Sequence, residues 1–263
     1  MDKLFKKFNL KGKVTIVVGG SGQIGSETVS TLLQAGSKVV NFDVYNSKKK
    51  TKNYFFYKID ITNEKQVLEL KRKFVQKHKK LNILVNHAHY KGSSKKLEPN
   101  KDFFNDLEDY PSKEWQKTLK TNLDGLFYVT KHFISLLKKN KNSVILNTSS
   151  TYGKVSPNKS IYGNSGINSP IGYTTSKFAI IGFTKYLAAH YGSFGIRANV
   201  LIPGGVNNAK QSKGFKKKYE YLTPLKRMAK KDEYREAILF LVSDASSYMT
   251  GSEFIVDGGW TAW

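Results

Sequence analysis

Tyr173 and Lys177 stand four residues apart in the stretch GYTTSKFAIIGFTKYLAAHYG, whose apolar periodicity predicts a helix from about residue 173. Residues i and i+4 of a helix share one face, so the phenol and the ammonium would be neighbours. A nearby positive charge favours the phenolate and lowers the pKa of the tyrosine, which would let it accept and donate protons near neutral pH. Such pairs are also common on helix surfaces without any chemistry, so the rest of the sequence must decide.

The elements that would position this pair alternate along the whole chain. Short β-branched runs predict strands within residues 13–20, 38–43, 53–60, 81–88, 142–150, 196–205 and 253–259. Longer amphipathic stretches predict helices within residues 24–36, 64–78, 112–139 and 232–246 besides the one near 173. The alternation is typical of βαβ units and predicts an α/β Rossmann fold. We expect a single domain over residues 1–263, with a doubly wound parallel sheet of about seven strands flanked by helices.

A glycine-rich stretch, VVGGSGQIGSE, joins the first predicted strand to the first predicted helix. Gly19, Gly22 and Gly25 would supply a tight turn that a dinucleotide pyrophosphate approaches closely, with its charge on the helix N-terminus. Ser21 and Gln23 are expected to add hydrogen bonds. Glycine spacing alone is a weak signal, but a strand before it and a helix after it strengthen the prediction of a dinucleotide site.

Asp43 ends the second predicted strand, eighteen residues beyond Gly25. A carboxylate there accepts hydrogen bonds from the ribose hydroxyls of NAD and repels the 2′-phosphate of NADP, so NAD is the favoured cofactor over NADP. Lys48, Lys49 and Lys50 follow shortly after and would weaken this repulsion. A turn residue at a strand end is the structural alternative for Asp43.

Taken in order, these motifs resemble those of the short-chain dehydrogenase/reductase family, in its single-domain Tyr-x-x-x-Lys form, over nearly the whole chain. The glycine turn resembles the family's opening motif, with Gln23 where its middle glycine is common. NHAH at 86–89 resembles the Asn-Asn-Ala-Gly motif, from which His87 and His89 depart. NTSS, PGGV and VDGGW resemble the serine strand, the Pro-Gly turn and the C-terminal signature.

The resemblance implies a catalytic set of Asn122, Ser150, Tyr173 and Lys177. Tyr173 would be the acid/base, and Lys177 would lower its pKa and bind the nicotinamide ribose. Ser150, chosen over Ser149, would bind the substrate oxygen, and Asn122 would hold a water that relays protons. The implied reaction transfers a hydride at one carbon and a proton at its oxygen, which interconverts an alcohol and a ketone.

The resemblance also implies a set of cofactor contacts at the ends of the strands, in which Asp60 would meet the adenine amine. Its members are Gly19, Ser21, Gln23, Ile24, Gly25, Asp43, Asp60, Ile61, Asn86, His87, Ala88, Tyr173, Lys177, Pro203, Gly204 and Val206.

Two irregular segments flank the expected active site. Residues 151–171 form an unusually long loop after the serine strand, which resembles the family's branch linked to flagellin modification and bacterial surface sugars. It suggests substrate contacts from Ser150, Tyr152, Tyr162 and the nearby His89. We therefore expect a hydroxylated, anionic substrate such as a sugar phosphate or nucleotide sugar of surface-glycan biosynthesis, although the loop could be rigid and play no substrate role.

Residues 207–224 form a basic, mobile-looking segment where the family places a lid over the substrate. Its lysines would either clamp a phosphate or simply lie in solvent. The family resemblance also implies a homodimer or homotetramer built partly on helices near residues 115–138 and 173–191. The ending GGWTAW fits either a buried contact or a frayed tail.

Composition narrows the remaining classes of function. The chain carries a formal net charge of +24 and no cysteine, which excludes disulfides and a cysteine nucleophile. No metal site is expected, because His87 and His89 lack a carboxylate partner at matched spacing. Only four of the 44 basic residues are arginine, so a lysine-coated surface is favoured over a nucleic-acid interface, with 48–50 and 216–221 as candidate anion-binding patches.

The lengths of the apolar runs bear on the location of the protein, and the residues present bear on whether it is an enzyme. Its first apolar run, Val14 to Val18, is too short for a signal peptide, and no stretch approaches the ~20 apolar residues of a membrane span. We expect a cytoplasmic protein without a membrane partner. A non-catalytic dinucleotide sensor or scaffold of the same fold is the alternative to an enzyme, but Ser150, Tyr173 and Lys177 are all present and favour the enzyme.

Overall fold

The computed structural model describes the chain except for residues 1–2, 48–50, 91, 93–101 and 210. Seven parallel strands form one sheet in the order β3-β2-β1-β4-β5-β6-β7. They are β1 (Val14–Val18), β2 (Lys38–Asp43), β3 (Tyr54–Lys58), β4 (Ile83–Asn86), β5 (Ser143–Thr148), β6 (Ile196–Pro203) and β7 (Glu253–Val256). The predicted doubly wound parallel sheet is confirmed, and its strand order reverses direction between β1 and β4, where such folds bind ligands.

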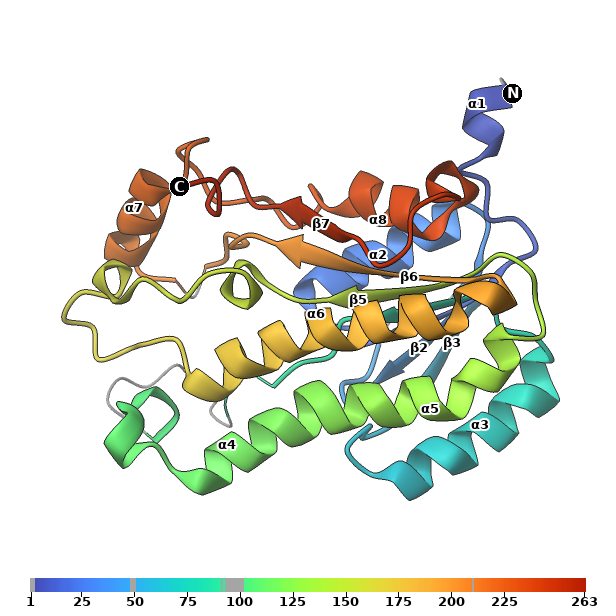
Figure 1. Cartoon of the computed structure of the whole chain (residues 1–263), viewed down its shortest axis with the longest axis horizontal. Helices are drawn as coiled ribbons and strands as arrows, with labels where there is room; N and C mark the ends of the chain where they lie inside the picture. Colours follow the sequence, from blue (N-terminus) through green and yellow to red (C-terminus); the bar gives the residue numbers. More distant parts are fainter. Residues whose placement is uncertain (1–2, 48–50, 91, 93–101, 210) are drawn as a thin grey trace.

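Helices cover both faces of the sheet (Figure 1). They are α1 (Lys3–Lys6), α2 (Gln23–Gln34), α3 (Glu64–His78), α4 (Ser112–Leu119), α5 (Gly125–Leu137), α6 (Ile171–Tyr191), α7 (Lys213–Leu222) and α8 (Arg235–Val242). α2 and α8 lie on one face, whereas α3, α5 and α6 lie on the other. Within the described residues, no helix combines the length and the apolar character that crossing a membrane requires.

The core lies on both sides of the sheet because every residue of β1 is buried. Successive side chains of a strand point to opposite faces. Ile16 therefore packs in the cluster that includes Phe133 of α5, and Val17 packs in the cluster that includes Leu32 of α2 and Ile238 of α8. Burying each such side chain contributes about 1.5 to 3 kcal/mol. This two-sided burial is what turns the strands into apolar runs instead of alternating patterns.

The predicted helix over 112–139 is divided in the structure. α4 and α5 are joined by one turn of π-helix over Lys120–Asp124, and α5 ends at Leu137. Gly125 follows this turn, and a Cβ there would lie 2.6 Å from Cγ1 of Ile61. The glycine therefore allows α5 to approach the segment after β3, and Asn122 lies within the π turn, a feature often found at functional sites.

Segments 151–171 and 207–224 are more ordered than their sequence predicts. The first contains 3-10 turns at Thr151–Gly153 and Lys159–Ile161, and α6 already begins at Ile171, directly after the extended Pro170. The second contains α7, a helix that the sequence analysis did not predict, whereas its role as a lid stays a prediction. α7 lies near the C-terminus, at the end of the molecule to which the strands point, opposite α1 (Figure 1).

Candidate active site

Ser150, Tyr173 and Lys177 meet just beyond the C-terminal end of β5. Tyr173 lies in the first turn of α6 and Lys177 one turn later, so the predicted i, i+4 pair shares one face. The Lys177 ammonium nitrogen lies 5.4 Å from the centre of the Tyr173 ring and donates a hydrogen bond to the Thr148 carbonyl at 2.9 Å. Ser150 hydrogen-bonds the Tyr173 hydroxyl. The three groups are thus placed as a substrate-oxygen binder, a proton carrier and a buried cation.

The electrostatics of Tyr173 differ from the expectation drawn from spacing. Burial raises the pKa of Tyr173 above its usual value, and the hydrogen bond from Ser150 lowers it only in part. Removing the ring from water disfavours the phenolate, so burial is the largest effect on this pKa. That Lys177 lowers the pKa of Tyr173 stays a prediction.

The structure distinguishes the two neighbouring serines. The Ser149 hydroxyl donates to the Lys177 backbone carbonyl at 2.7 Å and is 2% exposed. A Cβ on Gly153 would overlap this hydroxyl, so the glycine lets the loop cross close to α6. Ser149 has a structural role, which leaves Ser150 as the serine that reaches Tyr173.

Asn122 joins the two sides of the site from the π turn. Its amide oxygen accepts from the Tyr90 N–H at 2.7 Å, and its amide nitrogen donates to the Ser176 hydroxyl at 2.9 Å. Ser176 in turn donates to the Tyr173 carbonyl at 2.7 Å. The side chain of Asn122 therefore fixes the start of α6 against the segment after β4, and a role in a proton relay stays a prediction.

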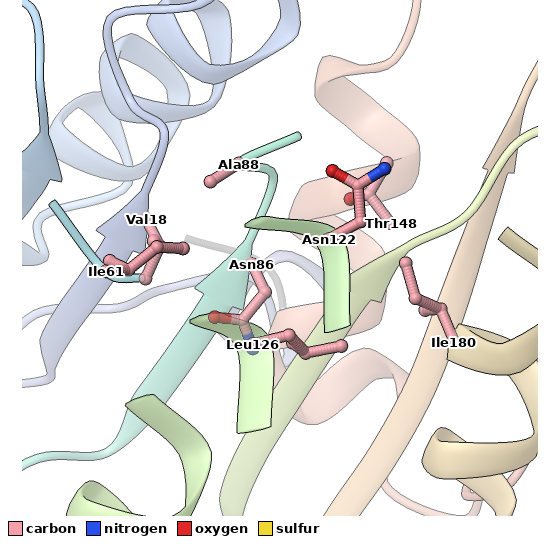
Figure 2. A pocket seen from close by; sticks show the side chains of 8 residues that line it. All are labelled: Val18, Ile61, Asn86, Ala88, Asn122, Leu126, Thr148 and Ile180. Atoms are coloured by element: carbon pink, nitrogen blue, oxygen red, sulfur yellow. The ribbon is translucent and has the colours of Figure 1, made fainter. Parts of the chain in front are cut away.

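A small cavity lies beneath the site (Figure 2). Its volume of about 10 Å³ is close to the minimum that a single water molecule needs. It is lined by Val18, Ile61, Asn86, Ala88, Asn122, Leu126, Thr148 and Ile180. The amide oxygen of Asn86 is buried without a hydrogen-bond partner among the described residues, so the cavity offers both the space and an acceptor for one water.

The glycine turn has the shape that a dinucleotide requires. Gly19 has a φ of +79°, and a Cβ on it would lie 2.7 Å from the Ala88 nitrogen. A Cβ on Gly25 would overlap the Gly19 carbonyl oxygen. Gly22 is the N-cap of α2 and supplies no side-chain cap, so the free N–H groups of the first helical turn suit a pyrophosphate. Ile24 lies in this same first turn.

Asp43 is held by backbone N–H groups on both of its oxygens. Its carboxylate accepts from Ser21 at 2.8 Å and from Tyr45 at 2.9 Å, and the residue is 8% exposed. The Ser21 hydroxyl donates to the Tyr45 carbonyl at 3.0 Å, so it secures the turn instead of pointing freely toward a phosphate. The carboxylate keeps lone pairs for ribose hydroxyls. Lys48, Lys49 and Lys50 lie outside the described residues.

Sequence reasoning missed Asn41, which supports the glycine turn from β2. Its amide oxygen accepts from Gly20 at 3.0 Å, and its amide nitrogen donates to the hydroxyls of Ser21 and Tyr54. A Cβ on Gly20 would overlap the Asn41 side chain, which explains the second glycine of the turn. The signal in the sequence was an asparagine within the apolar run KVVNFD, because a buried amide needs hydrogen-bond partners.

The side chain of His87 is buried and makes structural contacts, whereas its predicted contact with a cofactor stays a prediction. The ring is 6% exposed, with one nitrogen 2.9 Å from the Thr28 hydroxyl and the other 2.7 Å from the Thr148 hydroxyl. Burial, aided by the charge of Lys177, lowers the pKa of His87 to about 3. The neutral ring thus connects α2 to the end of β5, and only its backbone remains for a cofactor.

His89, in contrast, lies beside Tyr173, the predicted acid/base. Its ring is edge-on to that of Tyr173, with 6.1 Å between ring centres, and its Nδ1 donates to the His87 carbonyl at 3.0 Å. A glycine is expected at this position from the family motif. The imidazole is therefore an additional polar group next to the reacting position.

Loop 151–171 and α7 pack together as a cap, a name used here for residues 151–171 with α7 and Trp260. Tyr162 contacts Phe215 with ring centres 5.5 Å apart, and Tyr219 stacks on Trp260 at 4.2 Å. Tyr152 and Tyr162 share a hydrogen bond at 3.3 Å, and burial raises the pKa of both. Tyr152 and Tyr162, the substrate residues predicted in the loop, are thus partly buried and pack against the aromatic cluster of Tyr219 and Trp260.

One hydrogen bond joins α7 to loop 151–171, and another joins α7 to the C-terminal residue. Lys218 of α7 donates to the Ser160 carbonyl at 3.2 Å, whereas Lys213 and Lys217 are exposed and their role as phosphate ligands stays a prediction. Trp260 is 6% exposed, and Trp263 remains 74% exposed while its indole N–H donates to the Leu222 carbonyl. The C-terminal residues therefore make a contact with α7.

The remaining predicted cofactor residues lie at the same edge of the sheet. Pro203 ends β6, and Gly204 accepts a hydrogen bond from the buried Tyr234 hydroxyl at 3.1 Å. Val206 forms an isolated bridge with Ala229. Asp60 is exposed two residues after the end of β3, where its carboxylate accepts from the Thr62 N–H at 2.9 Å. The contacts of these residues with a cofactor stay a prediction.

Comparisons with known proteins agree with this arrangement. A family model described as enoyl-(acyl carrier protein) reductase matches residues 20–261. The 3-oxoacyl-(acyl-carrier-protein) reductase FabG of Thermotoga maritima is 31% identical over 95% of this chain and 98% of its own. Among solved structures, a short-chain dehydrogenase of Leptospira borgpetersenii with bound NAD+ is 33% identical, with a TM-score of 0.88 over 99% of this chain and 96% of its own. The aldohexose dehydrogenase of Thermoplasma acidophilum is 25% identical, with a TM-score of 0.82 over 97% of this chain and 96% of its own.

Proposed function

Because the chain belongs to the short-chain dehydrogenase/reductase family, we propose that it is an NAD-dependent enzyme that interconverts an alcohol and a ketone on a sugar phosphate or nucleotide sugar. The observation that carries the proposal is the meeting of Ser150, Tyr173 and Lys177 at the C-terminal edge of the sheet. Oxidoreduction is the activity that the family relatives support. The cofactor preference and the substrate class are the finer parts of the proposal.

The chain's own residues divide the work of the reaction. Ser150 binds the substrate oxygen, and Tyr173 takes the proton from the hydroxyl in oxidation or returns it in reduction. Lys177, a cation that is 1% exposed, stabilises the phenolate and binds the nicotinamide ribose. Bound NAD supplies the acceptor for the hydride from the carbinol carbon. Asn122 keeps α6 in place through Ser176, so that Tyr173 stays within reach of the oxygen.

The preference for NAD rests on Asp43. Its carboxylate is fixed by two backbone N–H groups, so it cannot turn away from an incoming 2′-phosphate without breaking them. A buried carboxylate beside a phosphate is unfavourable, whereas ribose hydroxyls can donate to it. The relative from Leptospira borgpetersenii was solved with NAD+, which supports the same preference.

The substrate class is inferred from the groups that surround the reacting position. Tyr152, Tyr162 and His89 present ring edges, hydroxyls and an imidazole near Tyr173, a lining that suits a hydroxylated ring better than an aliphatic chain. The lysines of α7 supply positive charge on the outer side of the cap for a phosphate group. The aldohexose dehydrogenase among the structural relatives supports a sugar substrate.

We also propose that the protein is a homodimer or homotetramer. The outer faces of α5 and α6 expose large apolar side chains, with Phe127 and Phe178 each 46% exposed and Tyr186 54% exposed. Both helices were expected to contribute to subunit contacts. Apolar residues of this size on adjacent helices favour burial against a second copy of the chain.

The decisive experiment measures NADH and NADPH binding by fluorescence and then turnover on sugar phosphates, nucleotide sugars, 3-oxoacyl thioesters and simple ketones. Tyr173→Phe keeps the ring but removes the proton carrier, so turnover should fall by at least about 100-fold while NADH still binds. Turnover that survives in Tyr173→Phe would overturn the assigned chemistry. Preferred turnover of the acyl thioesters would overturn the sugar substrate but not the reaction class.

A further inference from the structure

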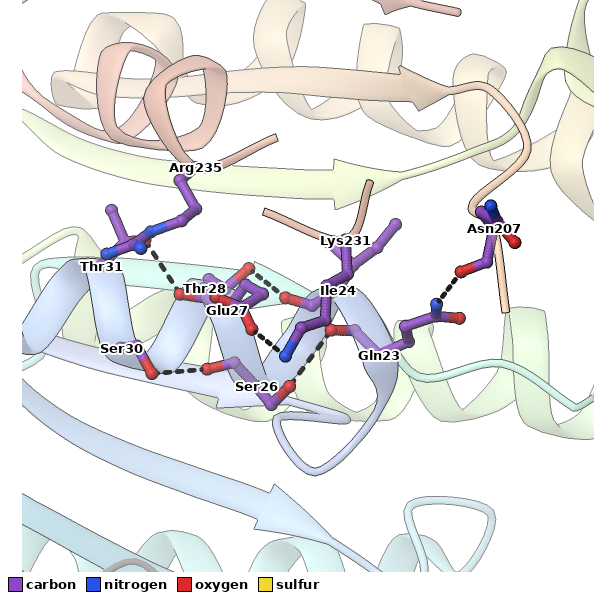
Figure 3. A network of polar contacts seen from close by, with 10 residues as sticks. All are labelled: Gln23, Ile24, Ser26, Glu27, Thr28, Ser30, Thr31, Asn207, Lys231 and Arg235. Atoms are coloured by element: carbon purple, nitrogen blue, oxygen red, sulfur yellow. Dashed lines mark hydrogen bonds and ion pairs between the residues drawn. The ribbon is translucent and has the colours of Figure 1, made fainter. Parts of the chain in front are cut away.

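A stripe of polar side chains along α2 connects the glycine turn, called the cofactor turn below, to the C-terminal part of the chain (Figure 3). Gln23, Glu27 and Thr31 are spaced four residues apart and therefore share one face of the helix. Their partners all come from the region after β6. The contacts are Gln23 Nε2 to the Asn207 carbonyl at 3.0 Å, Glu27 to Lys231 at 2.8 Å and Arg235 Nε to the Thr31 hydroxyl at 2.9 Å.

Gln23 differs from the other members of the stripe because it is also part of the cofactor turn. It is the first residue of α2, directly after the N-cap Gly22, so its backbone N–H belongs to the anion-binding first turn. Its side chain reaches in the other direction, to a residue 184 positions away in the sequence. Glu27 lies one full turn farther from the cofactor turn and makes no comparable contact with it.

Asn207 is well placed to transmit this contact to the cap. Its own N–H donates to the Ala229 carbonyl at 2.9 Å, and Gln211 accepts from the Asn208 N–H at 2.9 Å and donates to the Val206 carbonyl at 3.1 Å. α7 begins at Lys213, just after these bonds. Asn207 therefore lies in the short segment that precedes α7.

We propose that Gln23 is a latch: its hydrogen bond to Asn207 holds the start of segment 207–224 against the first turn of α2, and nucleotide enters and leaves the site when this bond opens. The inference rests on the proposed function, since it assumes that the turn binds a dinucleotide. A glycine, the common residue at this position of the family motif, has no side chain with which to make the bond. Gln23 is thus a positioning residue that couples the cofactor turn to the cap.

The size of the effect follows from the bond. A hydrogen bond of this type shifts an equilibrium by about 2- to 10-fold, so the open state should become more populated by this factor when the bond is lost. Because the latch must open for both passage in and passage out, the association and dissociation rate constants should rise together. The Kd, which is their ratio, should change by less than about 2-fold.

The test compares Gln23→Met, which keeps side-chain length and helix propensity but cannot donate, with Glu27→Gln, which breaks the neighbouring ion pair on the same helix face. Stopped-flow fluorescence with NADH, or with NADPH if that binds more tightly, gives both rate constants. Hydrogen exchange of the free protein over residues 206–216 gives a readout that needs no nucleotide. We expect Gln23→Met to raise both rate constants by about 2- to 10-fold and to speed exchange in this segment, with little change in Glu27→Gln.

Three results would overturn the latch. A rise in dissociation alone, with a proportional rise in Kd, would make Gln23 an ordinary nucleotide contact. Equal effects in Glu27→Gln would show a general loosening between α2 and the C-terminal region, and unchanged exchange in Gln23→Met would show that the bond does not hold the segment. If neither nucleotide binds the unaltered protein, the proposed function fails, and the exchange measurement alone decides whether the bond holds the segment.

Discussion

His78 makes the stability of this protein depend on pH in a way that one substitution should remove. The ring ends α3 and is 6% exposed, with ring centres 4.8 Å from Phe55 and 4.9 Å from Phe74. Neither ring nitrogen has a hydrogen-bond partner among the described residues. Burial lowers the pKa of His78 to about 4, and the positive charges of Lys38 and Lys77 act in the same direction.

The sign follows from which state binds the proton first. An unfolded histidine titrates near its ordinary value of 6.5, whereas the folded pKa is about 4. As pH falls from 7, the unfolded state gains a proton that the folded state cannot hold, so stability is lost from about pH 6.5 downward until the folded pKa is passed. The full shift corresponds to at most about 3 kcal/mol. Since the end of α3 is near solvent, which screens part of the charge, we expect about 1 to 2 kcal/mol between pH 7 and pH 5.

Urea unfolding of the unaltered protein and of His78→Phe at about pH 7, 6 and 5 measures this pH-dependent loss in the free energy of unfolding. His78→Phe should lose about 1 to 2 kcal/mol less than the unaltered protein between pH 7 and pH 5, because phenylalanine fills the aromatic site without titrating. His190→Gln, which removes an exposed histidine near the end of α6, serves as the control. His87 titrates in all three proteins and cancels from the comparison. Identical pH dependence in His78→Phe and the unaltered protein would refute the reasoning.

Three further predictions concern the cofactor, the core and the assembly. Asp43→Ser should lower the ratio of NADPH to NADH dissociation constants by about 10-fold or more, because it removes a carboxylate that faces the 2′-position; a constant ratio in fluorescence titrations would argue against this role. Gly125→Ala, whose Cβ would lie 2.6 Å from Ile61, should cost about 1 to 3 kcal/mol in urea unfolding, and an unchanged midpoint would contradict the close approach. Phe178→Glu should shift the mass measured by light scattering toward the monomer if α6 carries a subunit contact, and an unchanged mass would remove this face from the proposed interface.

The sheet was predictable because its strands are buried on both faces and therefore appear as short apolar runs bounded by turn residues. α7 was not recognised, although Phe215, Tyr219 and Leu222 have the i, i+4, i+7 spacing of a helix face. Because four of its ten residues are lysines, the segment has a polar composition that does not reveal this apolar face. The apolar side chains become meaningful only when loop 151–171 and Trp260 pack on them, and those partners are distant in sequence.

The sequence predicts which residues of the candidate site come together, but not all of the contacts that they make. Its glycine turn and the Tyr173–Lys177 pair are local patterns, and local spacing fixes their neighbours. Non-local contacts decided the rest. The sequence does not show that both ring nitrogens of His87 contact Thr28 and Thr148, which lie 59 and 61 positions away.

Tyr173 shows why spacing along a helix does not fix a pKa. Spacing correctly placed the Lys177 cation near the phenol, and this contact taken alone favours the phenolate. The same packing that brings Lys177 to the site also covers the phenol, and removal from water favours the neutral form. These two effects have opposite signs, and burial is the largest effect on the pKa of Tyr173 in the protein alone. Tyr173 therefore stays protonated near neutral pH in the protein alone, and additional positive charge beside it, such as an oxidised nicotinamide carries, would favour the phenolate that accepts the substrate proton.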